Sequence, residues 1–314
     1  MNFYHVLWTV PMKKNRWHYS YEDNVKMTIY YYGLSVAYLK KLNQKIDLYT
    51  DSEGKKILDH LPYDNIYVVL DNMDKNIPGC NWAAGKIESF KYSKLGDIYI
   101  DGDVFIKKQE CLDKLLENTN FDGYFAGLEN PQQRPFTCKK NDPNYEIKKN
   151  KYNMIYWDYN KIMEGFDFPL NIPIYGLNAC NGGLVIFNNQ EYKDKYLYAY
   201  DYMLNQIKKS EKVKEEYEKN YYLCLDLITE QRFFYEIGKE YKLGFLIDHW
   251  KRDDNIDYRL SKQANAIGFQ HVLSGVKYDL LDTCIRNLKI VDKNIYSLCY
   301  KKANKFYNLK YLNS

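Results

Sequence analysis

The amino-acid sequence predicts an α/β fold in which helices sandwich a mixed, mainly parallel sheet. Within the first 70 residues, apolar strand patterns alternate with a long helical pattern, and polar residues follow the strands. This alternation is typical of an open α/β sheet. The chain has 314 residues, of which 46% are hydrophobic and 27% are charged, so it can bury a substantial core and has a normal globular composition.

Periodicity and end signals predict the individual elements. The first strand is apolar and aromatic and ends at Pro11, and the first helix follows Asp23, a plausible cap, with apolar residues at roughly helical spacing. Short apolar runs predict the other strands, and longer runs predict the other helices. Strands are expected at 3–10, 46–50, 65–70, 97–100, 123–128 and 183–187, and helices at 24–42, 82–92, 107–118, 191–221 and 222–235.

A single domain is expected over residues 1–314. Three prolines interrupt the polar stretch 129–154, which predicts a surface excursion suited to acceptor binding rather than a domain boundary. The C-terminal segment 285–314 is basic, and its run 300–306 fits either a solvated terminal helix or a helix resting on an anionic membrane surface.

Composition excludes several classes of protein. A net charge of +4 from 45 basic and 41 acidic residues is too balanced for a dedicated nucleic-acid surface. The seven cysteines are scattered and odd in number, which argues against a zinc cage or a disulfide framework and favours a reducing compartment. No signal pattern or membrane span stands out. We expect a cytoplasmic protein, with peripheral contact at the inner face of a membrane left open.

The sharpest candidate site is the pair Asp101 and Asp103, which follows the predicted strand 97–100 and is separated by Gly102. Two carboxylates at this spacing can share a hard divalent cation that keeps positions open for phosphate oxygens, and glycine allows a close backbone approach. The same residues also fit a hairpin with a tight turn between two short strands. Both interpretations are open at the level of sequence.

The acid pair belongs to a longer pattern made up of Lys86, Ser89, Tyr92, Leu95, Asp101, Asp103 and Phe105. This pattern resembles the lysine helix, strand and DxD motif of GT-A glycosyltransferases. The resemblance implies a GT-A type, Rossmann-like fold in which Lys86 and Gly102 line the donor site. It also implies that Asp103 ligates a metal directly and that Asp101 contacts the ribose or the metal.

A second segment, 175–187, resembles the asparagine-glycine element that lies beside the donor sugar in this family. Its sequence is YGLNACNGGLVIF, so either Asn178 or Asn181 is the equivalent position, followed by Gly182. The glycines also fit a bend where the backbone passes close to another group, or an ordinary loop before a strand.

A third resemblance concerns the acid-glutamine element near the acceptor side of several GT-A families. Glu230 and Gln231 match it, and the resemblance implies that Glu230 or the nearby Asp226 orients the acceptor hydroxyl or acts as its general base. A solvated helix face is the alternative interpretation of the same residues.

The late segment 268–277 resembles the histidine-glycine-lysine segment of glycogenin-like transferases. The resemblance implies that His271 is the third protein ligand of the metal and that Gly275 and Lys277 lie at the diphosphate. The spacing differs from the family pattern, and a structural histidine is the alternative. Thr9 follows the first strand, where the family places uracil and ribose contacts.

Together these resemblances imply a metal-dependent transferase that moves a sugar from a nucleotide-diphosphate sugar, expected to be a UDP-sugar, to a carbohydrate or glycoconjugate acceptor. Mn²⁺ or Mg²⁺ is the expected cofactor, and retention of the anomeric configuration is weakly favoured. Two alternatives stay open: a non-catalytic carbohydrate- or nucleotide-sugar-binding protein, and a sugar nucleotidyltransferase. The second normally has a glycine-rich loop after the first strand, and residues 8–16 contain no glycine.

Overall fold

The computed structural model describes residues 2–14, 19–73, 83–129, 179–209, 227–247, 262–272 and 277–312. Except for its first residue, the expected surface excursion 129–154 lies outside these ranges. Asn178, Asp226 and Gly275 also lie outside them.

An eight-stranded mixed sheet runs through the middle of the molecule, in the order β3-β2-β1-β4-β8-β6-β7, with β9 paired to β6. The pairs β1–β2, β1–β4, β2–β3 and β6–β9 are parallel, whereas β8 runs antiparallel to β4 and β6, and β7 antiparallel to β6. The predicted α/β class with a mixed, mainly parallel sheet is therefore confirmed. The strands are β1 Phe3–Leu7, β2 Ile46–Thr50, β3 Ile66–Val68, β4 Ile98–Ile100, β6 Gly123–Glu129, β7 Ala179–Cys180, β8 Leu184–Phe187 and β9 Leu243–Ile247.

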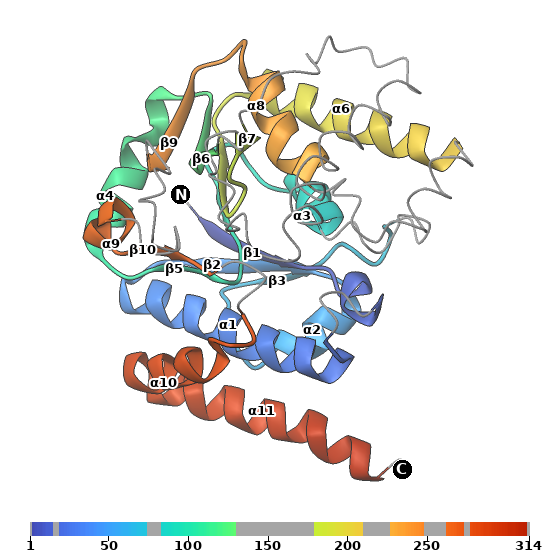
Figure 1. Cartoon of the computed structure of the whole chain (residues 1–314), viewed down its shortest axis with the longest axis vertical. Coiled ribbons are helices and arrows are strands. Elements are labelled where there is room, and N and C mark those ends of the chain that lie inside the picture. The colour runs from blue at the N-terminus through green and yellow to red at the C-terminus, as the bar shows by residue number, and fades with distance from the viewer. Residues whose placement is uncertain are drawn as a thin grey trace, which may run out of the picture.

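Helices cover both faces of the sheet (Figure 1). One face carries α1 and α2, with α10 and α11 stacked outside α1, and the other carries α3, α6 and α8. A separate two-stranded antiparallel sheet is formed by β5, Val104–Ile106, and β10, Phe269–His271. The helices are α1 Tyr21–Lys41, α2 Ser52–Leu58, α3 Ala83–Phe90, α4 Gln109–Leu116, α6 Gln190–Lys209, α8 Phe233–Gly238, α9 Lys262–Ile267, α10 Leu281–Val291 and α11 Lys293–Leu312.

Strand β1 shows why the sheet needs cover on both faces. All five of its residues are buried. Because side chains alternate along a strand, Phe3 and Leu7 enter the core beneath α1, whereas Tyr4 and Val6 enter the core beneath α3 and α6. The apolar run that predicted this strand therefore supplies two cores at once.

The start of α1 and the presence of α2 differ from the sequence prediction. Ser20, rather than Asp23, caps α1, because the Ser20 hydroxyl accepts a hydrogen bond from the Asp23 backbone N–H. The cap assigned to Asp23 was therefore wrong. Helix α2 was not predicted, and Asp51 caps it by accepting from the Gly54 N–H. Its seven residues are too few for helical periodicity to show.

The second half of the chain departs further from the predicted elements. The expected helix 222–235 is described from residue 227 onward, as a π-helical segment, Leu227–Arg232, that continues into α8. The expected helix 191–221 is described as α6 up to Lys209. Strands β9 and β10 were not predicted from their short apolar runs.

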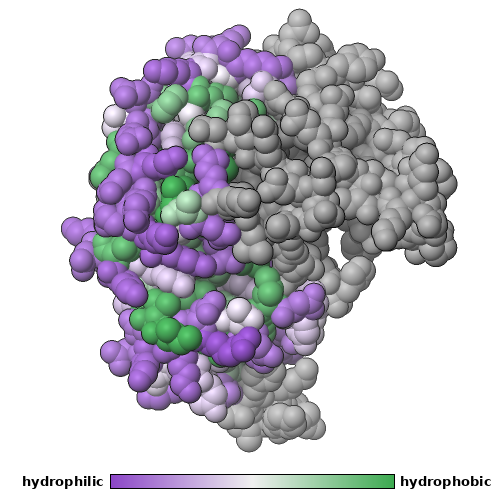
Figure 2. All heavy atoms as spheres, turned by 60° about the vertical axis from the view of Figure 1, so that its left-hand side comes forward, coloured by the Kyte–Doolittle hydropathy of each residue, from purple (hydrophilic) through white to green (hydrophobic). Residues whose placement is uncertain are grey.

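The basic C-terminal segment forms most of α10 and all of α11. Within α11, Cys299 and Ala303 are buried, whereas Lys301 and Lys305 are exposed. None of the helices in the described ranges is long and apolar enough to span a bilayer. On the face seen in Figure 2, hydrophobic atoms form separate patches among hydrophilic ones.

Candidate metal centre

Strand β4 delivers Asp101 to the edge of the sheet where β1 and β2 also end. The strand lies between β1, which is parallel to it, and β8, which is antiparallel. Immediately after the strand, the Asp101 backbone N–H donates to the Gly183 carbonyl at 2.9 Å. Carboxyl ends of parallel strands are where open α/β sheets bind ligands. The position of Asp101 therefore follows from the sheet topology.

The hairpin interpretation of this segment is wrong. Strand β4 pairs with β1 and β8, whereas the next strand, β5, belongs to the other sheet and pairs with β10. Gly102 lies in the turn between them, and a Cβ atom there would overlap the ring of Tyr32. The glycine is required by this close approach, and the turn separates two sheets instead of closing a hairpin.

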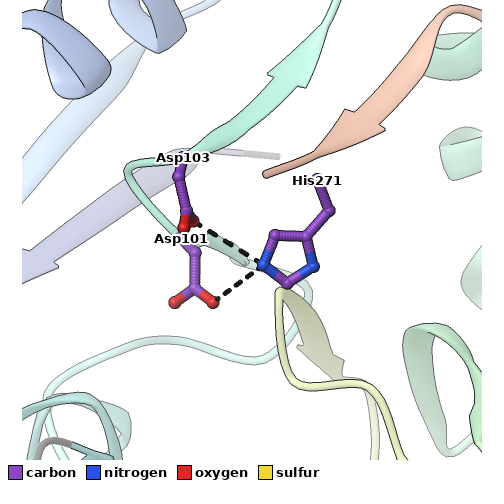
Figure 3. A group of neighbouring side chains, drawn as sticks. All are labelled: Asp101, Asp103 and His271. Atoms are coloured by element: carbon purple, nitrogen blue, oxygen red, sulfur yellow. Dashed lines mark ion pairs between the residues drawn. The ribbon is translucent and has the colours of Figure 1, made fainter. Parts of the chain in front are cut away.

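His271 reaches the acid pair through the small second sheet. In the β5–β10 register, His271 lies opposite Val104, and the Val272 N–H donates to the Asp103 carbonyl at 3.0 Å. The His271 Nε2 atom is then 3.6 Å from Asp101 Oδ2 and 3.6 Å from Asp103 Oδ1 (Figure 3). Two segments that are 168 positions apart in the chain thus supply one cluster.

These three residues fit a divalent cation. Each offers one ligand atom, and the three atoms lie within 4.8 Å of one another. Around a Mg²⁺-sized ion with ligands at 2.0–2.1 Å, neighbouring octahedral ligands are about 3 Å apart and opposite ones about 4.2 Å apart. The separations of 3.6 Å lie between these values and exceed hydrogen-bond length. The two carboxylate oxygens suit Mn²⁺ or Mg²⁺, whereas an imidazole nitrogen is more typical of softer metals, so the set fits Mn²⁺ better than Mg²⁺.

The imidazole ring of His271 is hard to explain as an ordinary core histidine. It is buried, and within the described ranges its Nδ1 atom has no hydrogen-bond partner. Buried polar atoms in folded proteins are nearly always hydrogen-bonded. The other ring nitrogen, Nε2, faces the two carboxylates, and this is where a metal-ligating nitrogen would have to lie.

The second oxygen of each carboxylate faces a lysine. Asp101 Oδ1 lies 3.1 Å from Lys86 Nζ and also accepts a hydrogen bond from the Tyr99 hydroxyl. Asp103 Oδ2 forms an ion pair with Lys277. The oxygens that face His271 are the other two, so neither lysine pairs with the two oxygens that belong to the triad.

Lys86 is the centre of a buried charge network. Its ammonium also donates to Glu230 Oε1 at 2.6 Å and to the Gly182 carbonyl at 3.0 Å. Burial lowers the pKa of Lys86, but Asp101 and Glu230 outweigh this effect and raise the pKa above its ordinary value. Burial likewise raises the pKa of Asp101, but Lys86 and His271 outweigh it, so the Asp101 pKa is lowered. The network keeps both groups charged.

The Asn181–Gly183 turn lies against the same network. The Asn181 side-chain oxygen accepts from the Gly183 N–H at 2.9 Å, and both residues are buried. A Cβ atom at Gly182 would overlap the Glu230 carboxylate, and one at Gly183 would overlap the His271 ring. The backbone bend expected from these glycines is therefore present, and the neighbouring groups are Glu230 and His271.

Two expected acceptor-side residues lie in the π-helical segment. Glu230 is 1% exposed and is engaged by Lys86. Gln231 follows it and is partly buried. In this structure Glu230 therefore belongs to the charge network around Asp101, and its role toward an acceptor stays a prediction.

Thr9 is buried after β1, and both its N–H and its hydroxyl donate to Asp51 Oδ2, at 2.8 and 2.7 Å. Both donors of Thr9 are therefore already used within the protein. For Thr9 to donate to a base or ribose, its hydrogen bonds to Asp51 would have to be broken. Three other expected site residues, Asn178, Asp226 and Gly275, lie outside the described ranges.

Two tyrosines at the site were missed by the sequence analysis. Tyr99 donates to Asp101, and Tyr32 packs against Gly102 while its hydroxyl donates to the Val6 carbonyl at 2.6 Å. The position of Tyr99 could have been noticed, because residues i and i+2 of a strand face the same side. Tyr32 gave no such signal, since it lies 70 positions before Gly102.

Comparisons with known proteins add one match. Residues 1–121 match a family described as a family of unknown function (DUF6734). This part includes Lys86 and the acid pair and ends before His271 and Lys277. Comparison with curated proteins and with solved structures returned no match.

Proposed function

We propose that this protein is a metal-dependent glycosyltransferase with a GT-A type fold, which transfers a sugar from a nucleotide-diphosphate sugar, expected to be a UDP-sugar, to a carbohydrate or glycoconjugate acceptor. One observation carries the proposal. The acid pair at the end of a central parallel strand is joined by a distant histidine in a geometry that suits a divalent cation. The order of the motifs along the chain supports it further.

Charge balance around the triad suits a diphosphate. Asp101, Asp103 and Glu230 contribute three negative charges, while Lys86 and Lys277 contribute two positive ones. A divalent cation would make this cluster net positive, which favours an anionic ligand. The chemistry that such a cation supplies is Lewis-acid neutralisation of the leaving diphosphate. The protein's own part is to orient Asp101 with Lys86 and Tyr99 and to present Lys277 at Asp103.

The proposed reaction favours retention of the anomeric configuration, following the glycogenin-like late segment. We place it in the cytoplasm, with polysaccharide or glycoconjugate synthesis as the setting.

Exposed lysines on α11, such as Lys301 and Lys305, support peripheral contact with an anionic membrane. Vesicle flotation with and without anionic lipid tests that contact, and lack of binding to anionic vesicles would remove it.

The first experiment is a thermal-shift panel of UDP, GDP, ADP and their sugar conjugates, with and without Mn²⁺. Wild type is compared with Asp103→Asn, which weakens one ligand, and with Asp113→Asn, which makes the same change at an exposed position on α4. Ligand binding stabilises the folded protein by mass action and so raises its unfolding temperature. The free energy of unfolding increases by about 2.7 kcal/mol when the ligand is at a hundredfold excess over Kd. We expect a Mn²⁺-dependent shift with one nucleotide diphosphate in wild type and Asp113→Asn only.

Absence of any Mn²⁺-dependent shift in wild type would contradict the proposal. For a nucleotide sugar that does bind, release of free nucleoside diphosphate separates an enzyme from a non-catalytic binding protein. Release of pyrophosphate from a nucleoside triphosphate and a sugar phosphate would instead identify a nucleotidyltransferase.

A further inference from the structure

The two lysines beside the triad differ in how firmly they are held. The side chain of Lys86 is 4% exposed, and its ammonium is bound by Asp101, Glu230 and the Gly182 carbonyl. The side chain of Lys277 is 31% exposed, and its ammonium pairs with Asp103 Oδ2. Lys86 is therefore a permanent part of the site, whereas Lys277 can reach solvent without breaking a buried network.

The backbone at Lys277 is anchored although its side chain is accessible. The Tyr31 hydroxyl of α1 donates to the Lys277 carbonyl at 2.7 Å. The next residue, Tyr278, stacks on Tyr19, with ring centroids 5.1 Å apart. A lysine carries its charge on a flexible four-carbon stem. Movement of the ammonium therefore needs only a change of side-chain rotamer.

We propose that Lys277 is an exchangeable counter-ion that occupies Asp103 in the metal-free protein, weakens the binding of a divalent cation there, and transfers to the anionic ligand when cation and ligand are both bound. The competition with the cation rests on the Lys277–Asp103 ion pair. The nature of the anion, a diphosphate, rests on the proposed function.

Electrostatics gives the direction of the effect. Asp103 offers Oδ1 to the space shared with His271 and offers Oδ2 to Lys277. A divalent cation bound at Oδ1 would lie on the same carboxylate as the ammonium, and the two positive charges repel each other in a partly desolvated site. A diphosphate bound to the cation offers the ammonium a new partner, so cation and anion strengthen each other's binding.

The opposite role is also conceivable from general chemistry. Groups that hydrogen-bond to ligating carboxylates often orient them and raise metal affinity. If Lys277 acts in this way, its removal weakens cation binding, whereas removal of a competitor tightens it. The sign of one measured change therefore decides between the two roles.

The test is a titration of the protein with Mn²⁺ alone. The concentration of free Mn²⁺ is measured at each step by electron paramagnetic resonance. It compares wild type with Lys277→Met, which keeps the length of the stem, and with Lys277→Arg, which keeps the charge. Lys301→Met makes the same change at an exposed position on α11. We expect Lys277→Met to bind Mn²⁺ on the order of tenfold more tightly, which corresponds to about 1.4 kcal/mol. The other two variants should match wild type.

An unchanged or weaker Mn²⁺ affinity in Lys277→Met overturns the proposal. The same titration in the presence of saturating UDP supplies the second arm. UDP should tighten Mn²⁺ binding more in wild type than in Lys277→Met, because only wild type can transfer the ammonium to the diphosphate. Equal tightening in both proteins contradicts the transfer.

The two arms separate this inference from the proposed function. If Mn²⁺ binds more tightly to Lys277→Met but none of UDP, GDP and ADP binds to either protein, the competition stands and the proposed nucleotide site fails. If Mn²⁺ binds wild type and Asp103→Asn equally, the cation is not held at the triad, and both proposals fall.

Discussion

The Tyr99 side chain shows how a single residue in a strand supports the site that follows it. Tyr99 and Asp101 share one side of the chain because strand side chains alternate, and the hydroxyl donates to the carboxylate. Burial, and then the charge of Asp101, raise the pKa of Tyr99 well above its ordinary value, so the hydroxyl stays protonated as a donor. The Tyr99 ring also lies under the Lys86 ammonium, 4.8 Å from its centroid.

Tyr99→Phe removes this donor and keeps the packing of the ring. We expect Mn²⁺ affinity to fall on the order of tenfold, as is typical when a group that orients a metal ligand is removed. Tyr4→Phe is the matched control, because Tyr4 lies directly opposite Tyr99 on β1 and is equally buried. Calorimetric titration of both variants checks the prediction, which is wrong if they lose Mn²⁺ affinity equally.

The element that completes the site is the short strand β10. Its register on β5 places His271 opposite Val104 and so beside Asp103. Hydrogen bonds of Val272 to Asp103 and of Lys107 to Gly268 bracket this pairing at its two ends. Because hydrogen-bonded and non-hydrogen-bonded pairs alternate in antiparallel strands, Gln270 and Phe105 form the hydrogen-bonded pair between them. The pairing of two three-residue strands thus sets the distance from histidine to carboxylate.

Gln270→Pro should break this pairing, since proline has no N–H to donate, and the carbonyl left without its hydrogen bond costs roughly 1 to 3 kcal/mol. We expect Mn²⁺ affinity to fall at least tenfold while far-UV circular dichroism still reports a folded protein. Gln270→Thr keeps the N–H and a good strand residue, and it should bind Mn²⁺ like wild type. Normal affinity in Gln270→Pro would show that β10 does not position His271.

At the scale of the whole molecule, the helices that flank the sheet are tied together by charges as well as by apolar packing. Lys302 of α11 pairs with Asp59 at the end of α2, at 2.7 Å. His60 lies next to this pair. Burial, and then the charge of Lys302, lower the pKa of His60 to about 4. His5, buried beneath α1, has its pKa lowered to about 3 by burial.

Lowered histidine pKa values predict acid sensitivity in a defined window. In the unfolded chain a histidine binds a proton below about pH 6.5, whereas in the folded protein His60 stays neutral down to about pH 4. Stability is therefore present above pH 6.5 and is lost as the pH falls from 6.5 to 4. When the pH is lowered from 7 to 5, the unfolding free energy of wild type should fall by about 1 to 2 kcal/mol more than that of His60→Gln. Urea titrations of both proteins at the two pH values measure this difference. Equal losses would contradict the prediction.

Much of the first half of the fold was determined by sequence patterns that act over short distances. The strand 46–50 was predicted to the residue, and the first helix and β4 within a few residues, because alternation and helical spacing are local signals. The first strand was expected to run to Val10, but it ends at Leu7, and Val10 and Pro11 begin a 3-10 helix, Val10–Lys14. The acid pair was found for the same reason, as two carboxylates directly after an apolar strand. The resemblance to GT-A enzymes then linked it to a distant histidine and lysine.

Tertiary structure alone decided what the local patterns left open. Whether the segment around Gly102 closes a hairpin depended on which strands β4 and β5 pair with, and this pairing is made with residues far along the chain. The burial of Glu230 against Lys86, and the use of Thr9 by Asp51, likewise result from contacts between distant segments. The sequence by itself determined which chemical groups are available and on which strands they lie, because backbone preferences are local. Their distances, partners and charge balance depend on packing, which is collective.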